Sequence, residues 1–228
     1  MSAIQWTAST QAVLFDLDGT LADTAGDLGG ALNALRVARG LEPMDLALLR
    51  PHASAGARGL IKVGLGIEPG HPEFEILRLA FLGAYTACLA DTTVLFPGVP
   101  ELLDRIEKAG LKWGVVTNKP HRFTIPIMQG LQLLQRSAVT ISGDTTAHAK
   151  PHPLPLLTAC EQMGVAPART LYVGDDLRDV QAAQAAGMPS AAAAWGYLGT
   201  QHEVGAWGAD VILQDPIDTF GQLCILRN

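Results

Sequence analysis

Residues 12–20 read AVLFDLDGT, an apolar run of four residues that ends in two aspartates and a glycine. Three later segments have the same form, an apolar run followed directly by small or polar residues. They are residues 113–116, 139–141 and 171–173, and weaker examples occupy residues 190–194 and 211–213. Continuous rather than alternating hydrophobicity is typical of strands that are buried on both faces of a parallel sheet.

Amphipathic helical patterns lie between these runs. Residues 101–109 place Leu102, Leu103 and Ile106 on one face, and Gly110 follows as a C-terminal cap would. A second pattern covers residues 176–186 and is also followed by a glycine. Alternating strands and helices predict an α/β fold, a doubly wound parallel sheet with helices on both faces.

An insert separates the first two predicted strands, which are about a hundred residues apart. That distance is too long for one crossover connection. Residues 22–92 carry only helical patterns, and the first of these places Leu28, Leu32 and Leu35 on one face. We therefore predict two domains: a core formed by residues 1–21 and 93–228, and an inserted, all-helical cap formed by residues 22–92.

The composition indicates an ordered, acidic protein. Hydrophobic residues make up 48% of the chain and charged residues 17%, which excludes an intrinsically disordered protein. The formal net charge is −6 and no cluster of Lys and Arg is present, so we expect neither nucleic acid nor an anionic membrane as a partner.

No targeting or membrane segment is expected. Residues 1–11 lack the basic and apolar parts of a signal peptide. Residues 180–202 are uncharged, but they contain Gln, Gly and Pro, which favours a helix end and a buried strand over a membrane span. The three cysteines are widely spaced and form no CxxC, which indicates reduced thiols. We predict a cytoplasmic protein that is a monomer or homodimer.

Carboxylates follow two of the predicted strands. Asp16 and Asp18 come directly after the first strand, and Asp175, Asp176 and Asp179 come after the strand at residues 171–173. The carboxyl ends of parallel strands meet at one edge of a sheet, where two groups of acids make a site for a hard cation such as Mg²⁺. Asp176 and Asp179 also have N-cap and N3 spacing, so whether either serves the metal or only the helix stays open.

Hydrogen-bond donors follow the two other strands. Thr117 and Asn118 offer a hydroxyl, an amide and backbone N–H groups, and Lys150 offers an ammonium. We interpret Lys119 as a surface lysine of the loop. Acids at two strand ends and donors at two others predict a phosphate-binding site with a metal ion.

Four motifs in order, FDLDGTL, VVTNKP, KPHP and VGDDLRD, resemble those of the haloacid dehalogenase (HAD) superfamily of phosphatases. The resemblance spans nearly the whole chain. Within the superfamily the chain is similar to phosphoglycolate phosphatases, and GLKWGVVTNKP and YVGDDLRDV also resemble the N-acetylmuramic acid 6-phosphate phosphatases of cell-wall recycling. The resemblance implies a HAD core with a helical cap, Mg²⁺ as cofactor and a small phosphate ester as substrate. The ester would be 2-phosphoglycolate or, alternatively, N-acetylmuramic acid 6-phosphate.

The resemblance also implies residue roles. Asp16 would be the nucleophile that forms an aspartyl-phosphate, and Asp18 would act first as general acid and then as general base. Mg²⁺ would be held by the Asp16 carboxylate, the Asp18 backbone carbonyl and Asp175. The phosphoryl oxygens would be bound by three residues: Thr117, Asn118 and Lys150.

Other functions are compatible with the same fold. A dehalogenase needs neither a second acid nor Mg²⁺, and a phosphonatase of this family needs a Schiff-base lysine in the insert, where Lys62 is the one lysine. Asp18 argues against both. A phosphate-binding protein without turnover is a third alternative, which the complete set of motifs disfavours.

One arginine of the insert is a candidate for substrate recognition. Arg58 lies in SAGARG, residues 54–59, ahead of an apolar turn. Small residues allow a ligand to approach closely, and a guanidinium can bind a carboxylate through two parallel hydrogen bonds. We predict that Arg58 binds a carboxylate of the substrate; the alternative is a solvated arginine on the surface of the insert.

Overall fold

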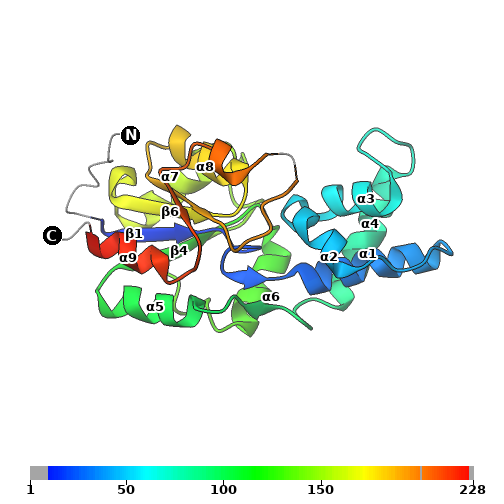
Figure 1. Ribbon diagram of the computed structural model, residues 1–228, viewed down its shortest axis with the longest axis horizontal. Helices are drawn as coiled ribbons and strands as arrows, with labels where there is room; N and C mark the ends of the chain where they lie inside the picture. The colour runs from blue at the N-terminus through cyan, green and yellow to red at the C-terminus, as the bar shows by residue number, and fades with distance from the viewer. Residues whose placement is uncertain (1–9, 201, 226–228) are drawn as a thin grey trace.

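The protein is represented by a computed structural model that describes residues 10–200 and 202–225, shown in Figure 1. Strands and helices alternate through most of the chain, except between β2 and β3. In chain order the elements are β1 (Ala12–Phe15), β2 (Ala22–Asp23), α1 (Ala25–Ala38), α2 (Leu46–Leu49), the 3₁₀ helix η1 (Arg50–Ala55), α3 (Gly56–Leu65), α4 (Phe74–Ala87), β3 (Val94–Leu95), α5 (Val99–Lys108), β4 (Lys112–Val116), α6 (His121–Gly130), β5 (Thr140–Ile141), α7 (Leu154–Met163), η2 (Pro167–Arg169), β6 (Thr170–Gly174), α8 (Leu177–Ala185), β7 (Ser190–Ala193), η3 (Val204–Ala206), β8 (Val211–Leu213) and α9 (Asp218–Ile225).

The main sheet of the described chain has six parallel strands in the order β5-β4-β1-β6-β7-β8. The strands predicted from apolar runs are all present, which confirms the α/β assignment. After β1 the chain adds β4 and β5 on one side, then returns to add β6, β7 and β8 on the other. The order reverses beside β1, and ligands of such sheets bind at the carboxyl ends of the strands at this point.

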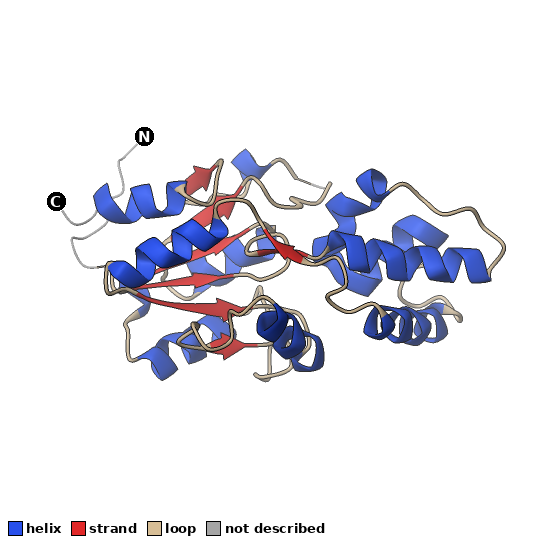
Figure 2. Cartoon of the chain, turned by 90° about the horizontal axis from the view of Figure 1, so that it is seen from below, coloured by secondary structure: helices blue, strands red, loops and turns tan. Residues whose placement is uncertain are grey.

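Helices cover both faces of this sheet because its strands are apolar on both faces. In β1, Val13 and Phe15 belong to the cluster that includes α5 and α6, whereas Ala12 and Leu14 pack with α7 and α8 on the opposite face. Figure 1 shows α7 and α8 above the strands and α5 and α9 below them, and Figure 2 shows the strands between the two layers. The sheet is therefore doubly wound, as predicted.

Helices α1 to α4 lie beyond the end of the sheet (Figures 1 and 2). The segment expected to be helical throughout begins differently: Ala22–Asp23 is a short strand that pairs antiparallel with Val94–Leu95. The two chain segments that run to and from the helices lie side by side, and pairing satisfies their backbone groups. The division into residues 22–92 and the remaining core stays a prediction.

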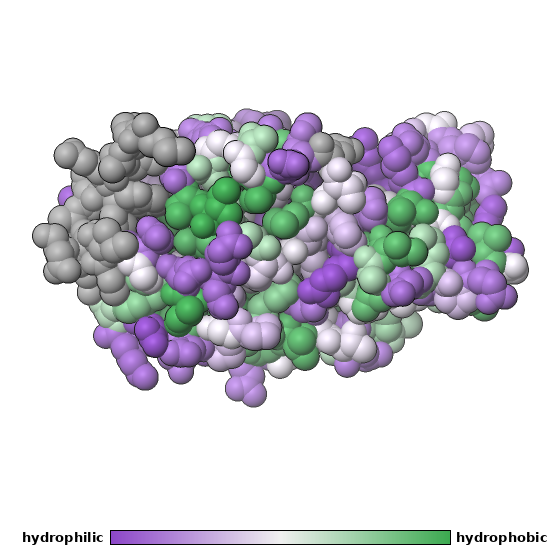
Figure 3. Space-filling view, in the orientation of Figure 1, coloured by the Kyte–Doolittle hydropathy of each residue, from purple (hydrophilic) through white to green (hydrophobic). Residues whose placement is uncertain are grey.

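Figure 3 shows apolar patches separated by polar surface over both the sheet domain and the helices. No helix among the described residues is long and apolar enough to cross a membrane. The prediction for residues 1–11 falls almost entirely outside the described residues.

Candidate active site

The predicted site residues meet at one edge of the sheet, where β1, β4 and β6 end. In the parallel register Phe15 lies beside Val115 of β4 and Val173 of β6. Successive parallel strands that end in register present their following residues together. The polar residues that follow these strands are Asp16, Thr117 and Asp175.

The ammonium of Lys150 lies beside Asp16. Its Nζ is 3.1 Å from Asp16 Oδ1 and 2.6 Å from Asp179 Oδ1, and it also donates to Tyr172 Oη (2.7 Å) and to the Val116 carbonyl (2.9 Å). Burial disfavours the charge of this lysine, but the carboxylates of Asp16 and Asp179 outweigh that effect and raise its pKa. Lys150 therefore stays charged beside the predicted nucleophile.

The side chain of Asn118 fixes the loop that carries Lys150. Asn118 Nδ2 donates to the Lys150 carbonyl and Asn118 Oδ1 accepts from the Lys150 backbone N–H, both at 2.9 Å. These bonds use one of the two Nδ2 protons of Asn118, which also lines the cavity described below, so its binding of phosphoryl oxygens stays a prediction. Thr117, only 3% exposed, accepts from the Lys119 backbone N–H at 3.1 Å, and its own hydroxyl proton remains free to point into the site.

Three buried carboxylates form a set that could hold a cation. Oxygens of Asp16, Asp175 and Asp179 lie within 4.8 Å of one another. Burial, together with the charges of Asp16 and Asp179, raises the pKa of Asp175 well above its ordinary value. Burial also raises the pKa of Asp179 to about 7, although Lys150 opposes the shift. One lysine does not compensate three acids, and carboxylate oxygens are the ligands that Mg²⁺ prefers, so the residues fit this cofactor.

Asp176 has a different environment. It is the N-cap of α8 and accepts from the Arg178 backbone N–H at 2.9 Å, while the Arg178 guanidinium binds both of its oxygens at 2.7 and 2.8 Å. Asp179 completes the capping box by accepting from the Asp176 backbone N–H at 3.1 Å. The predicted capping spacing is confirmed, and of the two acids only Asp179 also joins the carboxylate set.

Asp18 forms an ion pair with Lys119 and is not part of the set of three buried carboxylates. Lys119 Nζ lies 2.8 Å from Asp18 Oδ1, and the Thr24 hydroxyl donates to the same oxygen at 2.5 Å. The interpretation of Lys119 as a surface lysine is wrong: it is 9% exposed, and its Nζ lies over the Tyr85 ring, 4.9 Å from the centroid. Its partners come from distant parts of the chain, so no local pattern could have identified it.

Asp175 is fully enclosed by residues of three segments. Its Oδ1 accepts from the Thr20 hydroxyl at 2.9 Å, and its Oδ2 accepts from the Tyr197 backbone N–H at 2.8 Å and the Ser54 hydroxyl at 3.1 Å. Gly19 has φ +86°, and a Cβ there would overlap the carboxylate. Because Ser54 belongs to η1, the helical insert touches the acid set directly.

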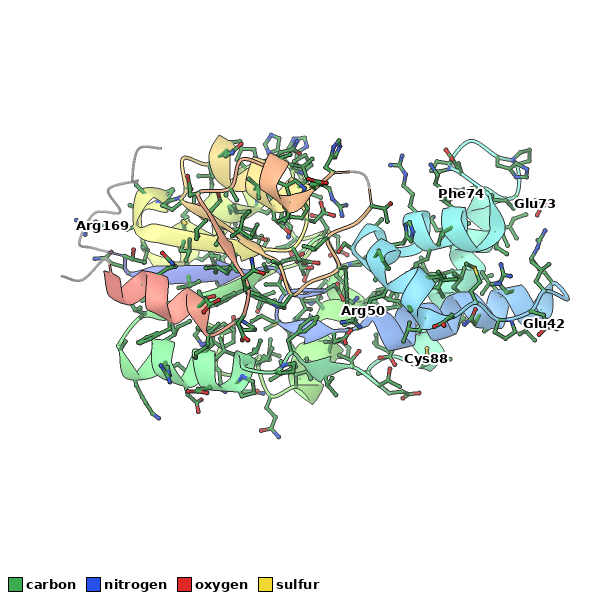
Figure 4. The ribbon with its side chains drawn as sticks, viewed as in Figure 1. Glu42, Arg50, Glu73, Phe74, Cys88 and Arg169 are labelled. Carbon is green, nitrogen blue, oxygen red and sulfur yellow. The ribbon has the colours of Figure 1, made fainter. Side chains whose placement is uncertain are left out.

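A second group of contacts joins the insert to the sheet domain. The Tyr197 hydroxyl accepts from the backbone N–H groups of Thr24 (2.7 Å) and Ala25 (3.0 Å), at the start of α1. Arg50 binds both oxygens of Asp23 and lies over the Tyr197 ring. Figure 4 shows Arg50 at the junction between the two parts of the molecule. These contacts hold the helices over the carboxyl edge of the sheet.

A cavity of about 280 Å³ lies between this edge and the helices. Its floor is polar and its upper wall is largely apolar. The floor includes Asp16, Asp18, Thr117, Asn118, Lys119, Lys150 and Asp179. The wall includes Leu28 of α1, Phe81, Leu82 and Tyr85 of α4, and Phe123 of α6.

Arg58 is not brought to this cavity. It lies in the first turn of α3, is exposed, and is absent from the lining, which Ala55, Gly56 and Ala57 complete on that side. The arginines that do line the cavity are Arg78 of α4 and Arg178 of α8. Arg58 points outward because the buried face of α3 is formed by Leu60, Ile61 and Gly64.

Comparison with known proteins agrees with this geometry. Residues 13–193 match the family described as haloacid dehalogenase-like hydrolase. The chain belongs to this family. It is 47% identical to an N-acetylmuramic acid 6-phosphate phosphatase of Pseudomonas aeruginosa over 90% of its length and 91% of that protein. It is 48% identical to a phosphoglycolate phosphatase of Xanthomonas campestris pv. campestris over 90% of its length and 93% of that protein.

The fold of this HAD-like hydrolase also matches solved structures. A phosphoglycolate phosphatase of Haemophilus somnus, itself named by prediction, aligns with a TM-score of 0.82 and 26% identity, over 96% of this chain and 99% of that one. The family and its relatives establish the chain as a phosphatase of the HAD superfamily. Relatives of nearly equal identity carry two different substrate names.

Proposed function

We propose that the chain is a Mg²⁺-dependent phosphomonoester hydrolase that acts on a small organic phosphate through an aspartyl-phosphate at Asp16. The main support is the pairing of Asp16 with Lys150 on the floor of the cavity, where their Oδ1 and Nζ atoms are 3.1 Å apart. A carboxylate beside a buried ammonium is a nucleophile that a phosphate dianion can approach without uncompensated repulsion.

The residues divide the chemistry between them. Asp16 attacks phosphorus as the ester P–O bond breaks, and the leaving alkoxide takes a proton from Asp18. Lys150 and the Thr117 hydroxyl bind phosphoryl oxygens, where charge accumulates in the transition state. Asp18 then removes a proton from the water that hydrolyses the acyl phosphate. Hydrolysis of phosphate monoesters is so slow that it can need up to about 10²¹-fold acceleration, which is consistent with the concentration of charged groups.

Asp18 must leave its partners to act in this way. In the structure it accepts from Lys119 and Thr24. Catalytic hydrogen bonds commonly form only with substrate present, so this pairing is compatible with the role. An anionic substrate would compete for Lys119 and release Asp18.

The predicted cofactor fits the acid set. Asp16, Asp175 and Asp179 offer the oxygens that would hold Mg²⁺, and the Asp18 backbone carbonyl stays a predicted fourth ligand. When bound, Mg²⁺ neutralises negative charge on the phosphoryl oxygens. Among the acids of α8, the pairing of Asp176 with Arg178 favours Asp179 as the supporting residue.

We propose 2-phosphoglycolate as the first candidate substrate, because relatives at up to 48% identity carry that name. N-acetylmuramic acid 6-phosphate is the second candidate, and the cavity favours it. A volume of about 280 Å³ approaches the ~300 Å³ at which pockets hold drug-sized ligands, more room than a two-carbon acid fills. The cytoplasmic location, the monomeric or dimeric state and the absence of nucleic-acid partners stay predictions.

Phosphate release from both candidates, with Mg²⁺ and then with EDTA, tests this function. We expect release that requires Mg²⁺, with kcat/KM higher for the physiological ester than for p-nitrophenyl phosphate. Tight binding of phosphate without release from any ester would identify a binding protein instead. Release that EDTA does not affect would contradict the cofactor assignment.

A further inference from the structure

Helix α4 presents one continuous stripe of side chains to the cavity. Arg78, Phe81, Leu82 and Tyr85 all line it, and their spacing of i, i+3, i+4 and i+7 places them on one helix face. The stripe is polar at its two ends and apolar between them. No role has been assigned to it in the chemistry at Asp16.

Tyr85 forms the deep end of the stripe. It is 2% exposed, and its ring packs against Phe123 with centroids 5.2 Å apart. Lys119 lies over the face of the ring and interacts with the Tyr85 hydroxyl, which has no partner of regular hydrogen-bond geometry among the described residues. Burial raises the pKa of Tyr85 to about 12, so the hydroxyl keeps its proton. Because Tyr85 lines the cavity, a small shift of its side chain would let this incompletely satisfied hydroxyl donate to a ligand there.

Arg78 forms the outer end. It precedes Tyr85 by seven residues, which places it about 10 Å farther along the helix axis. Its Nε pairs with Glu75 at 2.9 Å, and the side chain is 39% exposed, so the guanidinium retains N–H groups for a ligand. Figure 4 shows Glu73 and Phe74, where α4 begins, farther from the sheet than Cys88, which follows its end. The stripe therefore leads away from the catalytic floor.

The facing wall leaves room along the stripe. Across the cavity the lining consists of small residues at the junction of η1 and α3: Ala53, Ser54, Ala55, Gly56 and Ala57. The middle of the stripe is formed by Phe81 and Leu82, and Leu28 of α1, which belongs to the same apolar cluster, also lines the cavity. An apolar passage thus joins the floor to Arg78.

We propose that this stripe is the leaving-group subsite and that it selects a phosphomonoester of a long, partly apolar acid, such as a sugar carrying a carboxylate. The phosphoryl group lies on the floor, the Tyr85 hydroxyl donates to a polar atom of the leaving group near that end, and Arg78 binds the distant carboxylate. This inference rests on the proposed function. A two-carbon acid is too short to contact both ends of the stripe, because its carboxylate lies only a few ångströms from the ester oxygen, whereas Arg78 and Tyr85 are about 10 Å apart along the helix axis.

A pair of matched esters tests the role of Arg78. N-acetylmuramic acid 6-phosphate and N-acetylglucosamine 6-phosphate differ only by the lactyl ether that carries the carboxylate. Arg78→Gln should lower kcat/KM by about 10- to 150-fold for the first ester, the usual effect of a charge-assisted hydrogen bond, and by much less for the second. Arg105→Gln is the matched control, since Arg105 also pairs with a glutamate on an exposed helix face but lies outside the cavity lining.

Removing the Tyr85 hydroxyl tests its role at the deep end of the stripe. Tyr85→Phe keeps the ring and should lower kcat/KM for both sugar phosphates by about 2- to 10-fold, because an uncharged hydrogen bond is lost. Thr219→Val is the control: its buried hydroxyl also has no partner among the described residues, and it lies outside the cavity lining. A loss from Tyr85→Phe no larger than that of the control overturns the role of the hydroxyl.

Measuring the binding of sugar phosphates to an inactive variant tests this subsite independently of the proposed function. In an Asp16→Asn background, calorimetry compares the Kd of the two sugar phosphates with and without Arg78→Gln. We expect the preference for the carboxylate-bearing ester to disappear with Arg78. A preference that survives Arg78→Gln, or no preference at all, overturns the subsite. Lack of turnover by the parent enzyme on every ester would contradict the proposed function, while the binding comparison would still decide the subsite.

Discussion

The ammonium of Lys150 lies 2.6 Å from Asp179 Oδ1, and each of these side chains is only 2% exposed. The same ammonium reaches the predicted nucleophile Asp16 at 3.1 Å. Asp179 in turn is fixed at the start of α8 by the capping box with Asp176. The helix that follows β6 therefore positions a lysine of the loop after β5 beside the aspartate that follows β1.

Lys150→Met should leave buried acids without their cation. We expect the free energy of unfolding of the metal-free protein to fall by about 3–5 kcal/mol, the usual cost of breaking a buried ion pair from one side. Urea unfolding at pH ~8 with EDTA measures this, because the carboxylates are then most ionised. Lys112→Met is the control, since the hydrogen bond of Lys112 Nζ within the described part of the chain is to the Met163 carbonyl and not to a carboxylate. A loss no larger than that of the control would contradict the charge balance described here.

Asp18→Ala should show the signature of a lost general acid. For alkyl esters we expect kcat to fall about 10²–10⁴-fold. The fall should be smaller for p-nitrophenyl phosphate, whose leaving group needs little protonation. Steady-state kinetics on both esters provide the comparison, and equal losses would argue against proton donation to the leaving group.

Asp175→Ala and Asp176→Ala should separate a metal ligand from a helix cap. The first should weaken Mg²⁺ binding strongly, because Asp175 belongs to the carboxylate set. The second should lower stability by about 0.5–2 kcal/mol through loss of the α8 cap, with nearly unchanged Mg²⁺ affinity. Calorimetric titration with Mg²⁺ and urea unfolding of both variants distinguish the effects, and unchanged Mg²⁺ affinity in Asp175→Ala would remove it from the metal site.

The stability of the metal-free protein should fall as pH rises, and the stabilisation by Mg²⁺ should grow. Burial raises the pKa of Asp175, and raises that of Asp179 to about 7, above the ordinary 3.8. The folded state thus holds protons that the unfolded chain has already released, so the metal-free protein loses stability as pH rises from about 4 to about 7. Mg²⁺ replaces those protons and should stabilise the protein more at pH ~8 than at pH ~5.5. Tm measured with EDTA and with Mg²⁺ at both pH values tests this; a Tm with EDTA that rises over that range would contradict it.

The strands and the floor of the site could be predicted from the sequence because each depends on a local pattern. Burial on both faces makes β1, β4 and β6 continuously apolar, and the polar residue after each strand must lie at the carboxyl edge. Asp16, Thr117 and Asp175 were found in this way. Asp179 was predicted as a helix cap or a metal ligand. Its ion pair with Lys150 was not predicted, because it depends on the tertiary structure.

The insert was harder to predict because its helices depend on tertiary packing. Ile76 of α4 is apolar like its neighbour Leu77, but it is 70% exposed. The buried face is formed by Phe74, Leu77, Phe81 and Tyr85. Arg58 was predicted from the small residues around it, whereas Arg78 was not considered, although its spacing from Phe81, Leu82 and Tyr85 places all four on one helix face.

Trapping the phosphorylated enzyme tests the central claim most directly. After rapid acid quench during turnover of p-nitrophenyl phosphate with Mg²⁺, borohydride reduces an aspartyl-phosphate to homoserine, which mass spectrometry locates in the peptide. We predict that the reduced residue is at position 16 and that Asp16→Asn, with an unchanged Tm, yields no such peptide and no turnover. Steady turnover without a modified residue 16, or activity of Asp16→Asn within about tenfold of the parent, would contradict the account.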